Sequence, residues 1–469
     1  MISNQSILHF LSPLDVAIIA LSFVVFMVLP KIGLKKRAFS NKDYLVMGRG
    51  LSLPLFVATL TSTWYGGILG VTQIAFLHGI YSFVTQGLFW YISYLLFALF
   101  LVKRIRRHQV LSVPELIGLR FGMRARKYAA LLLFMHALPI TYALSLGIVM
   151  HMIMGIDFIM ALLLGVGLVT FYTAVGGLRG VVVTDAVQFM LMFVAVIMVV
   201  GFSWYTIGDV QVLKSSLPAE YFSVSQASLM SRGVIWLFIA CTTTFIHPVF
   251  YQRCLAASSD TTAQVGIGCA MLFWLIFDTC TCLGGMYARL LLPHADSTTA
   301  YVQLAMHILP HGLKGLFMAG VLATIISTLD SFLLVSGTAI SYDFLSRRHT
   351  PYAHYAAIGL TGIFVMLMGL IYRGDFEASW LFMEGAFSCA LLPSVLTALF
   401  TKSSLPAKNF FVPASSALVA FFSASFLNQL HNIAVEPFFI GHLFGLLGAG
   451  IMLYLHRQRN TKVTLFTNA

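Results

Sequence analysis

The sequence predicts an all-α membrane protein that crosses the bilayer many times, and two observations carry this prediction. The 469 residues are 59% hydrophobic and only 9% charged, with a mean hydropathy of +0.90, whereas soluble globular chains carry about 25% charged residues. The apolar residues also fall into long runs, and a bilayer core about 30 Å thick needs roughly twenty apolar residues per helix. We therefore expect one transmembrane domain over residues 1–469.

Thirteen apolar runs are long enough to be membrane-spanning helices. In chain order they cover residues 14–33, 53–79, 81–102, 127–155, 158–175, 181–206, 232–252, 263–290, 314–341, 352–372, 378–401, 409–427 and 437–456. The N-terminus lacks the basic segment and cleavage site of a signal peptide, so the first run is expected to be retained.

Lysine and arginine residues orient these helices, because basic residues gather in cytoplasmic loops. With the N-terminus outside and the C-terminus inside, all but five of the 28 basic residues lie on the inner side. The five exceptions are Lys214, Arg232, Arg289, Lys314 and Arg373. The net charge of +12 therefore reflects membrane topology, and we expect a lipid bilayer and no nucleic acid as a partner.

The order of the runs predicts two inverted repeats. Residues 53–207 and 231–401 each contain five runs, with one extra helix before them at 14–33 and two after them at 409–456. Because five is odd, the second set crosses the membrane in the opposite orientation to the first. Transporters built from inverted repeats bind their substrates near the membrane midplane, where helices are broken.

Two runs contain features that predict such breaks at equivalent places. The first helix of the first set reads ATLTSTWYGGILGVTQ at 58–73, where three glycines interrupt the apolar run. The first helix of the second set reads ACTTTFIHPVFYQR at 240–253; Pro248 lacks a backbone donor there, and the threonines can bond freed backbone groups. Close helix packing and a simple proline kink are the alternative interpretation. Breaks at matching positions in both sets favour a binding site.

A stripe of hydroxyl groups is predicted on the ninth helix. Within GVLATIISTLDSFLLVSGTAISYDF, the residues at i, i+3, i+4 and i+7 on one helical face are Thr324, Ser327, Thr328 and Ser331. Asp330 lies on the flank of this stripe, and hard cations prefer oxygen ligands. Hydroxyls in apolar helices also bond to carbonyls four residues earlier, which is the structural alternative. Four hydroxyls in register beside a carboxylate favour an ion.

Four carboxylates lie inside predicted spans: Asp185, Asp278, Asp330 and Glu384. Each one costs at least about 2.5–3.5 kcal/mol in the membrane, and no basic residue lies in the middle of a span, since Arg253 falls at an inner end. A metal cation or a proton would offset this cost. Asp278 and Glu384 suit either a gate or a contact between helices.

Four segments, in order along the chain, resemble the sodium:solute symporter family, which includes bacterial carriers of proline and sialic acid and the sodium–glucose carriers. The family signature of a Gly-Gly turn followed by Thr-Asp-x-x-Gln is similar to YTAVGGLRGVVVTDAVQ at 172–188. The other segments are LSVPELIGLRFG at 111–122, HPVFYQRCLAASS at 247–259 and LATIISTLDSFLLVSG at 322–337. The resemblance spans roughly residues 40–345 and implies a leucine-transporter-type fold with two inverted repeats, coupled to inward sodium flow.

The resemblance also implies which residues bind sodium. The expected ligands are three backbone carbonyls and two hydroxyls, from Leu60, Thr63, Thr324, Ser327 and Thr328. Asp185 falls on the family's aspartate. A second sodium site or the sodium exit path is implied at Asp185, Asp330 and Ser331.

Solute contacts follow from the same resemblance. The positions that correspond to solute-binding residues in similar carriers are Ser62, Trp64, Gly67, Gln86 and Thr243. His247 joins them because it lies at the predicted break of the seventh helix. The segment around Trp64 resembles choline carriers, and a tryptophan face attracts cations; packing is the alternative role for this side chain.

These observations predict a secondary active transporter in the plasma or inner membrane, working as a monomer. It would carry sodium and a small polar organic solute into the cell by alternating access. An amino acid or a quaternary amine is favoured over a sugar, because the polar residues of the sugar carriers are not reproduced. The alternatives are a transporter-like membrane sensor and proton coupling. No enzyme is expected, since the sequence has no nucleophile–base set.

Overall fold

A computed structural model describes residues 7–33, 40–224, 227–345, 350–371, 376–431 and 436–467. Within these ranges the regular secondary structure is helical, and the β pairing is limited to an isolated bridge between Leu51 and Ala257. The all-α prediction is therefore confirmed for the described part of the chain.

The described residues of the first half form ten α-helices: α1 (Pro13–Gly33), α2 (Asn41–Val46), α3 (Leu53–Ser62), α4 (Ile68–His78), α5 (Phe89–Leu96), α6 (Val102–Arg107), α7 (Val113–Phe121), α8 (Met123–His136), α9 (Ile140–Met154) and α10 (Phe158–Ile207). The second half adds α11 (Val210–Ser216), α12 (Ala227–Thr244), α13 (Pro248–Ala256), α14 (Asp260–Leu291), α15 (Ala300–Ile308), α16 (Leu313–Thr338), α17 (Pro351–Ile371), α18 (Phe376–Phe400), α19 (Lys408–His431) and α20 (Pro437–Thr467). A 3₁₀ turn, η3 (Tyr65–Gly67), separates α3 from α4, and π-helical turns form η4 (Phe83–Leu88), η5 (Phe97–Leu101) and η7 (Ala339–Phe344).

The count of thirteen spans is supported in part. Ten helical segments of the described chain are long and apolar enough to cross a membrane, and the bent pair α12–α13 makes eleven. The difference has two sources. Helix α10 covers two predicted runs, because they are separated only by Gly177 in a left-handed conformation (φ 55°, ψ −162°). In α18, a shorter apolar stretch, Gly385–Phe400, was found among the described residues.

Both predicted helix breaks are present. Helix α3 ends at Ser62, and α4 begins only at Ile68 after the η3 turn. Helices α12 and α13 meet at an angle of 41° across a short break that ends at His247. Pro248 is the first residue of α13, where a proline is tolerated because the backbone N–H groups of the first turn have no intrahelical acceptor in any case.

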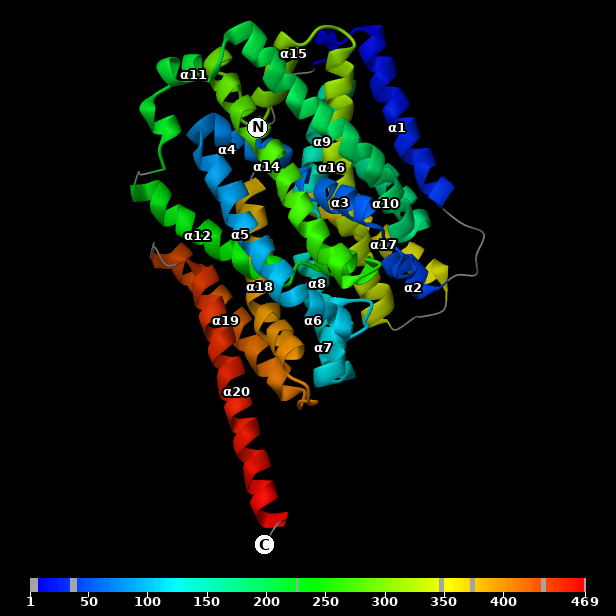
Figure 1. Ribbon diagram of the computed structural model, residues 1–469, viewed down its shortest axis with the longest axis vertical. Helices are drawn as coiled ribbons and strands as arrows, with labels where there is room; N and C mark the ends of the chain where they lie inside the picture. Colours follow the sequence, from blue (N-terminus) through cyan, green and yellow to red (C-terminus); the bar gives the residue numbers. More distant parts are fainter. Residues whose placement is uncertain are drawn as a thin grey trace.

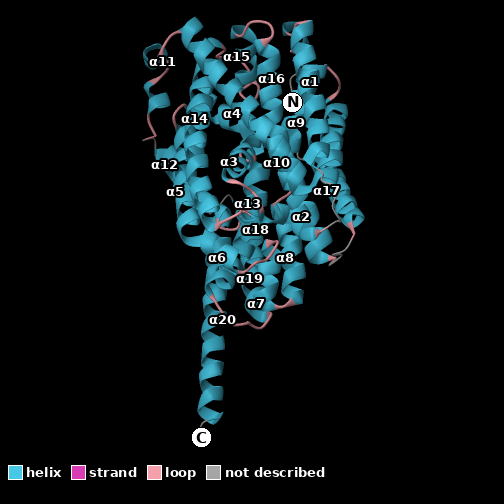
Figure 2. Ribbon diagram, turned by 45° about the vertical axis from the view of Figure 1, so that its right-hand side comes forward, coloured by secondary structure: helices cyan, strands magenta, loops and turns pink. Residues whose placement is uncertain are grey.

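Helix α16 occupies the centre of the bundle. Its most apolar window is entirely buried by protein, and it packs against α10, α1, α17 and α9. Helix α1 lies along one edge of the bundle, and α20 extends well beyond the other helices, with the C-terminus at its far end (Figures 1 and 2). Helix α16 is therefore placed so that its polar residues face other helices and not lipid.

Candidate cation and solute sites

The broken helix α3–η3 meets the middle of α16 through direct hydrogen bonds. The Ser327 hydroxyl donates to the Ser62 carbonyl at 2.8 Å, and the Thr328 hydroxyl accepts from the Gly66 amide at 2.8 Å. A Cβ atom on Gly66 would lie only 2.5 Å from the Thr328 Cβ. Glycine is thus required at this position because it lets the backbone of the break approach the hydroxyl pair.

The predicted sodium ligands of α16 lie at this contact, whereas no contact among the described residues places the carbonyls of Leu60 and Thr63 there. Leu60, Thr63, Thr324, Ser327 and Thr328 are all buried, with at most 2% of each exposed. The Thr324 carbonyl accepts from the hydroxyls of both Ser327 (3.1 Å) and Thr328 (3.3 Å). Three oxygens of α16 therefore converge beside the unwound backbone. On the broken helix, the Ser327 hydroxyl bonds to the carbonyl of Ser62, a residue that was not among the predicted sodium ligands.

Some of these hydroxyls bond to carbonyls earlier in their own helix, which was the alternative to ion binding. The Thr324 hydroxyl bonds back to the Gly320 carbonyl at 2.7 Å, as is common in apolar helices. The hydroxyls of Ser327 and Thr328 bond back as well, but each also reaches across to the broken helix. Within this stripe, the Thr324 hydroxyl therefore bonds within its own helix, whereas the Ser327 and Thr328 hydroxyls also join α16 to the broken helix.

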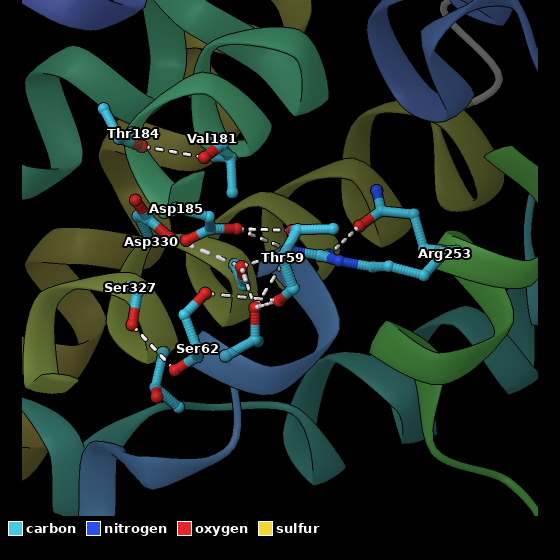
Figure 3. A network of polar contacts seen from close by, with 12 residues as sticks. Thr59, Ser62, Val181, Thr184, Asp185, Arg253, Ser327 and Asp330 are labelled. Carbon is cyan, nitrogen blue, oxygen red and sulfur yellow. Dashed lines mark hydrogen bonds and ion pairs between the residues drawn. The ribbon is translucent and has the colours of Figure 1, made fainter. Parts of the chain in front are cut away.

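Two buried carboxylates lie about one turn away, toward the predicted cytoplasmic end. Asp185 of α10 accepts a short hydrogen bond from the Thr59 hydroxyl of α3, and Asp330 of α16 accepts from the Tyr172 hydroxyl at 2.6 Å. Neither aspartate is exposed to any extent. Figure 3 shows both carboxylates directed toward the same group of side chains around Thr59.

The expectation that the embedded carboxylates lack a basic partner is wrong. Arg253 of α13 is completely buried, and its Nη2 atom lies 3.6 Å from Asp185 Oδ2. The same nitrogen donates to the hydroxyl of Ser331 at 2.6 Å and to that of Thr63 at 3.2 Å. The α12–α13 bend turns α13 inward, and the long arginine side chain then reaches the carboxylates from a helix end.

This polar cluster keeps one unused acceptor. Within the described chain, the Asp185 Oδ1 atom is buried and has no hydrogen-bond partner. Buried polar atoms are nearly always paired, so an unpaired carboxylate oxygen beside hydroxyls fits a bound cation or proton. The side chain of Glu384 lies outside the described side chains, so its expected role as a gate or helix contact has no structural description.

A separate pocket lies beside the break, on the α4 side of it. Its cavity of about 120 Å³ has room for several water molecules and hence for a small solute. Of the predicted solute-binding residues, those that line it are Trp64, Gly67, Gln86, Thr243 and His247. Ser62 is not among its described lining residues; its carbonyl accepts from the Ser327 hydroxyl, and its own hydroxyl donates to the Thr59 carbonyl at 3.4 Å.

The pocket also contains residues that no sequence motif assigns to it. These include Gln73, Trp90, Thr141, Tyr142, Ser145, Trp236 and Asp278. Asp278 was recognisable in the sequence as a carboxylate inside a span. Its position in the pocket was not, because that depends on how α14 and α12 pack. The aromatic residues had no distinguishing signal, since a tryptophan in an apolar run is equally suited to lipid or to the core.

Paired helix breaks around a central helix, with a pocket beside them, define a membrane carrier. The chain belongs to the sodium:solute symporter family, whose model matches residues 44–376. It is 26% identical to the sodium/myo-inositol cotransporter 2 of Sus scrofa, over 77% of this chain and 60% of that protein. It is 24% identical to the high-affinity proline transporter PutP of Bacillus subtilis (strain 168), over 78% of this chain and 83% of that protein.

Solved structures support the fold. A Na⁺-coupled sialic acid symporter, in a substrate-bound outward-open state, is similar with a TM-score of 0.78 and 17% identity, over 95% of this chain and 98% of that one. The nucleobase-cation-symport-1 transporter MHP1 gives a TM-score of 0.52 at 12% identity, over 90% and 92% of the two chains. These likenesses agree with the leucine-transporter-type fold and a multi-pass membrane protein. The chain spans about three fifths of the length of the myo-inositol relatives.

Proposed function

We propose that this protein is a sodium-coupled symporter of the plasma membrane that carries a small polar organic solute into the cell by alternating access. The observation that carries the proposal is the contact of the Ser327 and Thr328 hydroxyls with the unwound backbone between α3 and α4. A sodium ion in this contact would replace hydrogen bonds between the two helices by bonds to shared oxygen ligands.

The coupling follows from the position of this contact. The pocket residues Trp64 and Gly67 belong to the same break that supplies the expected sodium ligand Thr63. An ion that fixes the backbone of the break therefore also fixes one wall of the pocket. Coupling between two sites is reciprocal, so sodium should raise the affinity for the solute and the solute should raise the affinity for sodium.

The inner polar cluster suits an exit path or a second ion. Asp185, Asp330 and Ser331 lie on the predicted cytoplasmic side of the Ser327 contact, and Arg253 bridges the first and last of them. Because Arg253 already supplies a positive charge there, an ion leaving the Ser327 contact would meet both attraction and repulsion. Such a balance favours release over tight retention.

Uptake by proteoliposomes tests the proposal directly. Radiolabelled candidate solutes are offered under an inward sodium gradient, an inward potassium gradient, or an inward proton gradient without sodium. We expect accumulation with sodium alone. Accumulation driven by protons without sodium would support proton coupling instead, and binding without any accumulation would support the sensor alternative.

A pair of variants ties the activity to the hydroxyl contact. Ser327→Ala and Thr328→Ala should each raise the sodium concentration needed for half-maximal uptake by about tenfold or more, because each removes one ligand of a buried ion. The matched control is Thr361→Ala on α17, whose hydroxyl bonds back to the Ala357 carbonyl of its own helix at 2.8 Å. Unchanged sodium dependence in both site variants contradicts the site.

A further inference from the structure

The wall of the solute pocket contains a buried carboxylate that the sodium chemistry does not use. Asp278 of α14 is 4% exposed and lines the pocket together with Gln86 and Thr243. Its contacts are separate from the Asp185 cluster, since they are made with Tyr65 of η3 and Tyr91 of α5.

The hydrogen bonds of Asp278 leave its charge without a counter-ion. The Tyr65 hydroxyl donates to Oδ1 at 2.8 Å, and the Tyr91 hydroxyl makes a short hydrogen bond to Oδ2. A carboxylate has about four acceptor positions, so two tyrosines leave acceptor capacity in the pocket. Among the described residues, no ion pair includes Asp278, and no lysine or arginine lines this pocket.

Space for the carboxylate is provided by a glycine in an unusual turn. A Cβ atom on Gly87 would lie 3.0 Å from Asp278 Oδ2, which is tighter than ordinary contact. Gly87 belongs to the π-helical turn η4, which also holds the pocket residue Gln86. Single π-helical turns are frequent at functional sites, and this one places an amide side chain and a carboxylate on the same pocket.

Aromatic rings line the pocket that Asp278 shares. Its aromatic lining is Trp64, Tyr65, Trp90, Tyr142 and Trp236, with His247 next to them. The Trp64 ring stands edge-on to Trp90, with 4.9 Å between their centroids, and 5.0 Å from the His247 ring. Aromatic faces attract organic cations, and most strongly where water is excluded. A carboxylate and tryptophan faces on one pocket are complementary to the same kind of ligand.

We propose that Asp278 is the counter-ion for a positively charged nitrogen of the solute, so that the pocket selects small organic ammonium compounds. Zwitterions with an ammonium group belong to this class, whereas polyols and sugars without a charge do not. The inference rests on the proposed function, because it takes the pocket to be the solute site of a carrier. It assigns to Asp278 a specificity role that is distinct from the sodium contact at Ser327.

Thermal unfolding of the purified full-length protein in sodium buffer tests this with a matched pair of probes. Choline carries a quaternary ammonium, and 3,3-dimethyl-1-butanol has the same shape without the charge. We expect choline or the zwitterion glycine betaine to raise the unfolding temperature at millimolar concentration, and the neutral isostere and myo-inositol to leave it unchanged. This comparison needs no variant. Equal stabilisation by the isostere or by myo-inositol overturns the proposal, as does the absence of stabilisation by every ammonium probe.

Two variants then test the residue. Asp278→Asn should weaken ammonium binding by about tenfold or more, because it removes a desolvated charge pair. Tyr91→Phe keeps the carboxylate and should change binding by only a few fold. Asp278→Asn protein that folds normally and binds choline as the parent does overturns the assignment. If choline stabilises the parent protein equally when potassium replaces sodium in the buffer, the sodium-coupled function fails while the role of Asp278 stands.

Discussion

The Arg253 guanidinium lies 3.6 Å from the Asp185 carboxylate, and both side chains are completely buried. The arginine belongs to the second broken helix pair and the aspartate to α10, and Arg253 also donates to Thr63 at the end of the first broken helix. One side chain thus joins both breaks to the carboxylate of the family signature. This arrangement makes the pair a mechanical as well as an electrostatic link between the two halves.

Loss of this arginine should destabilise the protein strongly. Arg253→Gln leaves a buried carboxylate without its partner, which costs about 3–5 kcal/mol. The free energy of unfolding or the unfolding temperature of the purified protein measures the effect. Arg179→Gln is the control, since Arg179 pairs with Asp43 at 2.8 Å where both side chains are partly exposed, and such pairs contribute about 0–1 kcal/mol. Similar losses in the two variants would contradict a special role for Arg253.

Gly66 should not tolerate a side chain. In Gly66→Ala, the new Cβ would lie 2.5 Å from the Thr328 Cβ, so the break and α16 must separate, and sodium-dependent uptake should fall by about tenfold or more when the ligands no longer converge. Uptake as a function of sodium concentration measures this. Gly201→Ala on α10, where nothing lies within 4 Å of the new Cβ, should behave as the parent protein. Normal sodium dependence in Gly66→Ala would show that the contact is not the ion site.

Gly177 should be essential for stability, because its backbone is left-handed. At φ 55° and ψ −162° a new Cβ would lie 2.6 Å from the Tyr44 ring, and this backbone conformation, which is almost confined to glycine, alone costs other residues about 1–3 kcal/mol. Gly177→Ala should therefore lower the unfolding temperature. The control, Gly167→Ala, has open space around its Cβ and should be neutral or stabilising by up to about 1 kcal/mol. A stable Gly177→Ala protein would argue that α10 is continuous and not two spans.

A polar network at the predicted cytoplasmic end should hold that side closed. Asp343 of η7 lies 2.8 Å from the Arg126 Nη2 atom of α8 and accepts from the Ser112 hydroxyl at 2.8 Å. Asp343→Asn weakens these bonds and should shift the population toward an inward-open state. The measurement is the labelling rate of a cysteine at Gln252, which lines the adjoining cavity, in a background without other reactive cysteines.

The rate with Asp343→Asn should exceed the rate in the cysteine variant alone by several fold. Asp260→Asn supplies the control, because its pair with Arg106 at 2.6 Å is half-exposed on the carboxylate side and lies outside this network. An equal increase in the labelling rate from both substitutions would mean that loss of any ion pair on the cytoplasmic side has this effect, which would contradict a specific role for Asp343.

The helical class, the broken helices and the family could all be predicted from the amino-acid sequence. These properties depend on local chemistry: apolar length decides whether a helix spans the bilayer, and proline and glycine decide where backbone bonding fails. The hydroxyl register on α16 was equally readable, because the helical period places Ser327 and Thr328 on one face. Most of the solute residues that the family resemblance implies line the pocket, but Ser62 does not.

The partners of the buried charged groups could not be predicted in this way, because they depend on how distant helices pack. Arg253 counted as a residue at a helix end until the bend of α13 carried its side chain to Asp185. Asp278 meets Tyr65 and Tyr91, which are 213 and 187 residues away along the chain. Such pairings depend on the directions in which separate helices cross, and a sequence specifies those directions only through the packing of all the helices together.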